Sequence, residues 1–90
     1  MQVENIGKLQ SLRVKIDLID NQIKNLLTER SKVVGQIAKY KKTRNLNTFD
    51  KEREKAILEN TENSLQKAVF KQILRESKKE QTRERNESQS

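Results

Sequence analysis

The fold is decided by residues 12–41, which read LRVKIDLIDNQIKNLLTERSKVVGQIAKYK. Apolar residues recur here at alternating spacings of three and four, which is the period of one α-helix face. Extended toward the N-terminus, the apolar line comprises Leu9, Leu12, Ile16, Ile19, Ile23, Leu26, Val33 or Val34, Ile37 and Tyr40. We predict one helix that begins around Ile6 to Lys8 and ends near Lys42, roughly 50 Å long at 1.5 Å per residue. A helix of this length cannot cover its own apolar face, so it needs partners.

Polar residues interrupt this apolar face and the faces of two shorter segments that follow it. Position 30 belongs on the apolar line but holds Arg30. The other interruptions are Asp50, Arg53, Glu54, Ser77 and Gln81. A charge that faces a packed interior is costly unless it is paired or binds a ligand. The interruptions therefore predict a polar pocket inside a helical protein.

Composition restricts both the architecture and the chemistry. Only 31% of the 90 residues are hydrophobic and 37% are charged, so we expect a core shared between subunits rather than a stable monomer. The chain has no cysteine and no histidine, which excludes disulfides and removes the commonest metal ligands and general base. We therefore predict no metal site. A net charge of +7 is compatible with nucleic acid, a membrane surface or a small anion as partner.

The rest of the chain predicts two more helices and no strand. Residues 43–48 form a loop whose asparagines tolerate left-handed backbone conformations. The second helix is expected to start between Thr48 and Asp50 and to end near Asn60. The third is expected to start at Ser64, as its N-cap, and to fade after Gln81. The prediction is an all-α, three-helix protomer over residues 1–81 with a polar, frayed tail over 82–90. Neither a signal peptide nor a membrane span is visible, so we expect a cytoplasmic protein.

Helix geometry separates the cations of the first helix into two groups. Arg30 and Lys41 lie three turns plus about 20° apart, so they share a face and could lean toward one small anion. Arg13 lies about 25 Å before Arg30 and about 100° around the axis. One small ligand cannot reach both arginines on a straight helix. If Arg13 serves the same kind of pocket, that pocket belongs to another subunit, as an antiparallel pair of long helices would allow.

The residue types in this pocket favour binding over proton transfer. Asp50, Arg53 and Glu54 are three and four residues apart and cluster on the first turns of the second helix, and Ser77 and Gln81 lie one turn apart. Together with the cations they could hold carboxylates, a hydroxyl and uncharged oxygens. A nucleophile–base pair is missing. The set suits binding, or a reaction that needs placement and charge stabilisation.

At these residues the chain resembles the small, standalone, all-helical chorismate mutases. The matching segments are residues 12–41, FDKERE at 49–54 and FKQILRESKKEQ at 70–81. Each segment alone is weak evidence for the family, because helices rich in Arg, Lys and Glu are common. The three segments in this order are a fairly specific match to it. The resemblance implies an intertwined homodimer of three-helix protomers. It also implies conversion of chorismate to prephenate by a Claisen rearrangement, a step toward phenylalanine and tyrosine, without any cofactor.

The resemblance also implies roles for the cations of the pocket. Arg30 would bind one substrate carboxylate in its own subunit, and Arg13 would reach a carboxylate in the partner's pocket. Lys41 and Gln81 would hydrogen-bond the ether oxygen, where negative charge grows as the carbon–oxygen bond breaks. Because Gln81 is neutral and needs no protonation, we predict no requirement for acidic pH.

The remaining roles concern the ring of the substrate. Glu54 and the Asp50 region would hold the ring hydroxyl, Ser77 would contact the ring carboxylate, and Arg53 would support the Asp50 turn. Asn45 and Asn47 depart from the family, which often has Gly and Pro before the residue at Asp50. We therefore expect a looser turn there.

Several other interpretations remain. An isochorismate pyruvate-lyase shares this scaffold, and a mutase acting on the 4-amino analogue of chorismate (an aminodeoxychorismate mutase) would differ only near Asp50 and Glu54. A non-catalytic basic helical module that binds nucleic acid or a partner helix would explain the charge. Against nucleic acid, the cations lie along an apolar face and the chain has few aromatic residues. Singly, each polar residue is also explained by snorkelling, ion pairing or helix capping.

Overall fold

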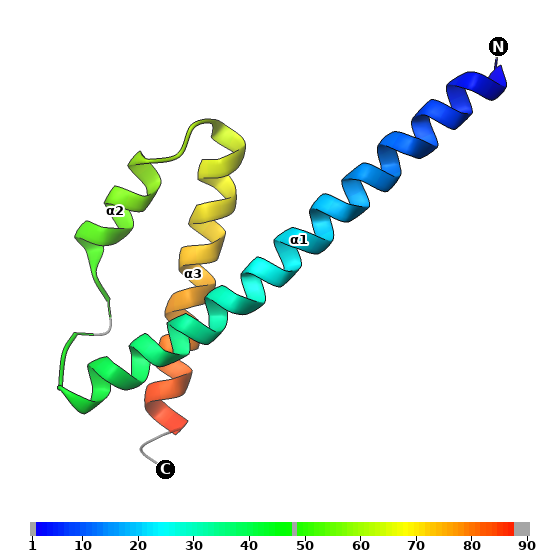
Figure 1. Cartoon of the computed structure of the whole chain (residues 1–90). Helices are drawn as coiled ribbons and strands as arrows, with labels where there is room; N and C mark the ends of the chain where they lie inside the picture. Colours follow the sequence, from blue (N-terminus) through cyan, green and yellow to red (C-terminus); the bar gives the residue numbers. More distant parts are fainter. Residues whose placement is uncertain (1, 48, 88–90) are drawn as a thin grey trace. The chain divides into compact units, whose positions relative to one another are not determined.

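A computed structural model of the chain describes the backbone of residues 2–47 and 49–87 and the side chains of residues 7–47 and 49–83. Over these residues the chain forms the helices α1 (Gln2–Thr43), α2 (Lys51–Glu59) and α3 (Ser64–Glu87), and no strand (Figure 1). The predicted all-α, three-helix class is confirmed. None of the described helices combines the length and the apolar character needed to cross a membrane. The chain divides into two compact units, residues 1–30 and residues 31–90.

The first unit is the N-terminal part of α1. The helix begins at Gln2, earlier than the predicted start at Ile6 to Lys8. Its apolar line is largely exposed in the single chain: Leu12 is 45% exposed, Ile19 54% and Leu26 62%. Side chains of this size normally lie inside a protein or an interface. The exposed line is therefore an uncovered apolar face within this unit.

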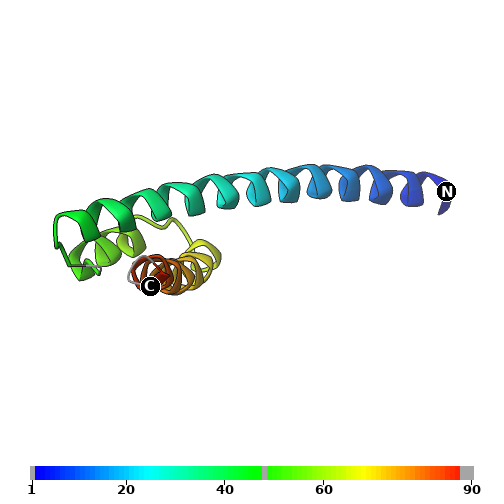
Figure 2. The ribbon, with the colours of Figure 1, turned by 90° about the horizontal axis from the view of Figure 1, so that it is seen from below.

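The second unit contains a small core built from α1 and α3. Val34 and Ala38 on α1 are buried, as are Leu74 and Ser77 on α3. The Ser31 hydroxyl donates a hydrogen bond to Glu80 Oε1 at 3.0 Å and so joins the two helices. Helices α2 and α3 contact each other and lie side by side in both views (Figures 1 and 2). The core is small because two of its four members, Ala38 and Ser77, have short side chains.

A left-handed asparagine ends α1. Asn45 has a positive φ of 54°. The N–H of Leu46 donates to the carbonyl of Lys41 at 2.7 Å, and the N–H of Asn45 donates to the carbonyl of Lys42 at 3.1 Å. This pair of hydrogen bonds is the Schellman motif, in which the residue with positive φ is most often glycine. Asn45 thus takes the conformation that the asparagines of this loop were expected to tolerate, and the turn is closed by defined hydrogen bonds.

Asp50 begins α2 as its N-cap, as expected for this start. Its Oδ1 accepts a hydrogen bond from the N–H of Arg53 at 3.0 Å, and its carbonyl accepts from Glu54 at 3.1 Å. The helix ends at Glu59, followed by Asn60 as C-cap. Both ends agree with the sequence prediction. Thr48, the earliest start that we considered, lies outside the described residues.

The start and the end of α3 both differ from the prediction. Ser64 is the first helical residue rather than the N-cap, because Asn63 Oδ1 accepts from the N–H of Gln66 at 2.9 Å. Gln66 Oε1 in turn accepts from the N–H of Glu62 at 2.8 Å, which resembles the reciprocal bonds of a capping box. The helix also continues past Gln81 to Glu87, although residues 82–87 contain no apolar side chain.

The left-handed turn after α1 gives a test of stability. Asn45→Ala should lower the free energy of unfolding by about 1 kcal/mol, because a Cβ is disfavoured at positive φ and alanine lacks the local hydrogen bonds of asparagine. Asn45→Gly should be neutral or stabilising at the same position. Urea unfolding followed by circular dichroism measures both. Asn47→Ala, two residues later and outside the Schellman bonds, is the control, and an equal loss in Asn47→Ala would contradict this explanation.

Candidate active site

An ion pair between two helices marks the candidate site in the second unit. Glu54 on α2 and Lys78 on α3 approach to 3.0 Å between Oε2 and Nζ. Their side chains are 24% and 42% exposed, so each is partly desolvated. Glu54 was predicted to bind a substrate hydroxyl, and the structure pairs it with Lys78 of α3, which follows the predicted residue Ser77 in the sequence. Lys78 was not predicted.

A cavity of about 250 Å³ lies at this ion pair. Its lining comprises Glu54, Leu58, Lys71, Leu74, Arg75 and Lys78. Lys71, Arg75 and Lys78 are four and three residues apart, so they project from one face of α3. One carboxylate therefore meets three cations beside two leucines. Such a lining suits an organic anion with an apolar body.

Ser77 and Gln81 occupy successive turns of the same helix. Ser77 is 6% exposed, and its hydroxyl donates to the carbonyl of Ile73 at 2.8 Å. Gln81 is half-buried, and its Oε1 is buried without a hydrogen bond from any residue that the structure describes. An unsatisfied buried acceptor costs about 1–3 kcal/mol. A bound molecule with a donor would remove this cost, so Gln81 is the clearest indication of a ligand among the predicted residues.

Lys41 lines a second hollow of the same unit. This hollow measures about 350 Å³ and is lined by Val33, Gln36, Ile37, Tyr40, Lys41 and Leu46. Lys41 is half-buried near the end of α1, and its carbonyl accepts the hydrogen bond that closes the Schellman turn. The Asn45 turn therefore fixes the backbone that carries this lysine.

Asp50 and Arg53 lie at the exposed start of α2. The Asp50 carboxylate accepts the capping hydrogen bond from Arg53, and both side chains are exposed. The cap sets where α2 begins and thereby where Glu54 lies on its first turn. The structure thus gives Asp50 a helix-capping role, while its predicted contact with a substrate hydroxyl stays a prediction.

The two predicted arginines of the first unit lie on α1. Arg13 is exposed, and Arg30 is half-buried at the last position of the unit. Their predicted roles rest on helix spacing and on the family resemblance. Of the eight predicted residues, the second unit holds Lys41, Asp50, Arg53, Glu54, Ser77 and Gln81.

The described side chains offer no metal centre. Nowhere in the described part of the chain do three or more Asp and Glu residues gather closely enough to hold a metal ion. Apart from the carboxylates of Asp50 and Glu54, the polar groups of the site are ammonium, guanidinium, amide and hydroxyl donors. They can bind the carboxylates and oxygens of an anion and can stabilise charge that develops on it.

Lys71, Arg75 and Lys78 line the cavity at the ion pair but were not predicted from the sequence as candidate site residues. A usable signal was present, because their spacing of four and three places them on one helix face with Leu74. Isolated lysines and arginines on a helix are ordinarily solvated charges, however, and only the packing of α2 against α3 distinguishes these from the rest.

Comparison with known proteins identifies the chain by family. Residues 12–82 match the family model described as chorismate mutase type II. Neither the comparison with curated proteins nor that with solved structures returned a match. The matched segment includes every predicted site residue, from Arg13 to Gln81.

Proposed function

We propose that the protein, which belongs to the chorismate mutase type II family, rearranges chorismate to prephenate. The observation that carries this proposal is the family match over residues 12–82, because it spans all eight predicted site residues. Prephenate is a precursor of phenylalanine and tyrosine, so the reaction would serve aromatic amino-acid biosynthesis in the cytoplasm.

The reaction suits a site built from cations and neutral donors. The substrate is a dianion that breaks a carbon–oxygen bond and forms a carbon–carbon bond within one molecule, with no proton transferred. Its two reacting ends must first be folded over each other. Fixed cations that hold both carboxylates select that compact geometry and remove most of the entropic barrier. No nucleophile, acid or base is required.

Lys41 and Gln81 would accelerate the bond-breaking step. Negative charge grows on the ether oxygen as the carbon–oxygen bond lengthens, so a donor at that oxygen binds the transition state more tightly than the ground state. An amide and an ammonium both supply such donors. The buried Oε1 of Gln81 is an acceptor, so it supports the presence of a ligand that carries a donor, while the role at the ether oxygen would belong to the Nε2 amide of the same side chain. By helix spacing, Arg30 shares a face of α1 with Lys41. Arg30 would hold a substrate carboxylate.

The ring substituents would be held by α2 and α3. Glu54 would accept a hydrogen bond from the ring hydroxyl, with Asp50 contributing from the helix start and Arg53 supporting that turn. Ser77 would contact the ring carboxylate. The partial burial of Glu54 and the burial of Ser77 support these roles, since a hydrogen bond to a partly desolvated group is stronger than one in water.

The active site would be shared between two copies of the chain. Large apolar side chains along the first unit of α1 remain about half exposed, which favours a second α1 as their cover. Arg13 is too far along the helix to reach the pocket that Arg30 serves. An antiparallel pairing of two α1 helices about a two-fold axis would bring Arg13 of one protomer to the site of its partner.

Product identity gives the direct test of this function. The purified protein should convert chorismate to prephenate, detected as loss of chorismate absorbance and, after acid treatment, as phenylpyruvate. Isochorismate offered in parallel should not yield salicylate and pyruvate. Formation of salicylate plus pyruvate without prephenate would assign the chain to the lyase reaction instead. Steeply salt-dependent RNA or DNA binding with no turnover would favour the non-catalytic module.

The role of Lys41 predicts a large kinetic loss. Lys41→Ala should lower kcat/KM for chorismate by a factor of about 100 or more, corresponding to about 3 kcal/mol of transition-state stabilisation. Lys39→Ala is the matched control, because Lys39 is exposed and lies on the opposite side of α1. Steady-state kinetics on variants with native circular dichroism makes the comparison. Near-normal turnover by folded Lys41→Ala would refute the role.

The shared site predicts complementation between inactive chains. Arg13→Ala and Lys41→Ala should each be nearly inactive alone. An equal mixture with exchanged subunits should recover about a quarter of the wild-type activity, because half of the dimers are mixed and each mixed dimer has one intact site. Subunit exchange is verified by native mass spectrometry. Absence of recovery despite proven exchange would show that Arg13 acts within its own protomer or not at all.

A further inference from the structure

The geometry points to Lys78 as a specificity-determining residue: through its ion pair with Glu54 it makes the enzyme select a ring hydroxyl and reject a ring amine. This inference rests on the proposed function, since it concerns the group that Glu54 would bind. Chorismate and its 4-amino analogue differ only in that group. Lys78 would therefore decide which of the two substrates the chain uses.

The Lys78 ammonium is held in place by two neighbours from other parts of the unit. It lies 3.0 Å from Glu54 Oε2 on α2. It also lies 5.8 Å from the centre of the Phe49 ring, just before α2, within the range of a cation–π interaction. An ammonium with an anion and an aromatic ring as neighbours has a preferred position. Lys78 thus supplies a fixed charge to the cavity.

Two further cations increase the positive potential of this cavity. Lys71 and Arg75 line it together with Lys78, and Glu54 is the one carboxylate in the lining. Lys78 already compensates that carboxylate. The surplus charge of the lining is therefore positive, which suits an anionic substrate and disfavours any additional cation.

This charge balance distinguishes a hydroxyl from an amine. Glu54 keeps unused acceptor sites after it pairs with Lys78, since an ionised carboxylate accepts about four hydrogen bonds. A neutral hydroxyl can donate to one of them without electrostatic cost. An aliphatic amine is mostly protonated near neutral pH. As an ammonium it would lie near Lys78 and would compete for the same carboxylate, so binding it requires displacing the ion pair or accepting repulsion.

Substrate competition tests the inference. The ratio of kcat/KM for chorismate to kcat/KM for 4-amino-4-deoxychorismate is measured for the full-length protein and for Lys78→Met. The unaltered protein should prefer chorismate. Lys78→Met should shift the ratio toward the amino substrate by roughly tenfold, because Glu54 then loses its 3.0 Å ion-pair partner and can pair with a substrate ammonium instead. Lys78→Arg keeps the charge and should keep the ratio.

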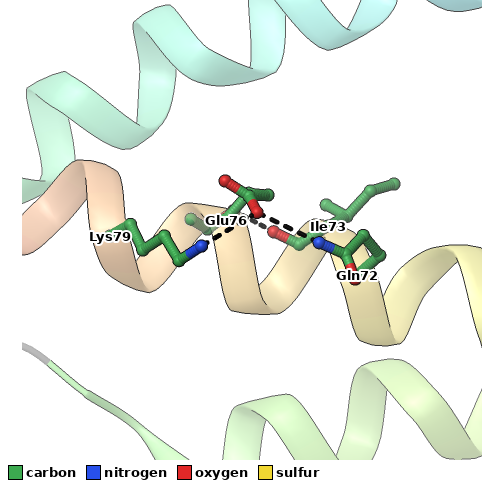
Figure 3. Close-up of polar contacts among 5 residues, drawn as sticks. Gln72, Ile73, Glu76 and Lys79 are labelled. Atoms are coloured by element: carbon green, nitrogen blue, oxygen red, sulfur yellow. Dashed lines mark hydrogen bonds and ion pairs between the residues drawn. The ribbon is translucent and has the colours of Figure 1, made fainter.

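The neighbouring lysine provides a matched control. Lys79 pairs with Glu76 on its own helix at 3.3 Å, as Figure 3 shows, and is 62% exposed. Lys79→Met removes the same charge from α3 without touching Glu54, so the ratio should not move. If Lys79→Met changed the ratio as much as Lys78→Met does, the shift would come from the net charge of the protein and not from the Glu54 ion pair. That result would overturn the inference.

The remaining outcomes are also decisive. An unchanged ratio in folded Lys78→Met, or equal losses with both substrates, would overturn the specificity role while leaving the mutase activity in place. If Lys78→Met does not fold by circular dichroism, Lys78→Gln carries the same comparison. No turnover of either substrate by the unaltered protein would overturn the proposed function, and this inference with it.

Discussion

The second unit depends on the burial of a very small core between α1 and α3. Val34 and Ala38 from one helix and Leu74 and Ser77 from the other are its buried residues among the described side chains. Each burial contributes at most about 1.5–3 kcal/mol, and the short side chains contribute less. The core nevertheless fixes the site, because Lys41 lies one turn beyond Ala38 and Gln81 one turn beyond Ser77. Packing that is modest in area thus determines where the two proposed donors to the ether oxygen can lie.

Much of this architecture could be predicted from the sequence because it is encoded locally. The apolar period of residues 12–41 required a long helix, and Asp50 caps α2 as its residue type suggests. The errors arose where local signals compete. Asn63 and Ser64 are both good N-caps, and the reciprocal bonds of Gln66 favour Asn63. Beyond Gln81 the helix continues through a sequence without apolar residues, and helix propensity accounts for this because Arg and Glu are good helix formers.

Candidate site residues could be selected from the sequence only in part, for a related reason. Arg30, Glu54, Ser77 and Gln81 stood out because they interrupt apolar faces, which is a property of the sequence. Lys78 did not stand out, because nothing in the sequence distinguishes it from the other lysines expected on the surface of a helix. Its partner Glu54 is on another helix, and the 3.0 Å contact exists only once α2 packs on α3. Pairing between helices is tertiary information, whereas the interruption of a helix face is not.

Charge then connects binding, rate and specificity in the proposed enzyme. A dianion needs cations to be captured, and a rearrangement without proton transfer gains most from donors placed at the oxygen that becomes negative. The same positive potential acts on every other group of the ligand. It favours neutral or acidic substituents and opposes basic ones, unless a carboxylate is left uncompensated to receive them. Because Lys78 compensates Glu54, the charges that would attract the substrate would also exclude its amino analogue, and the proposed selectivity would require no additional binding element.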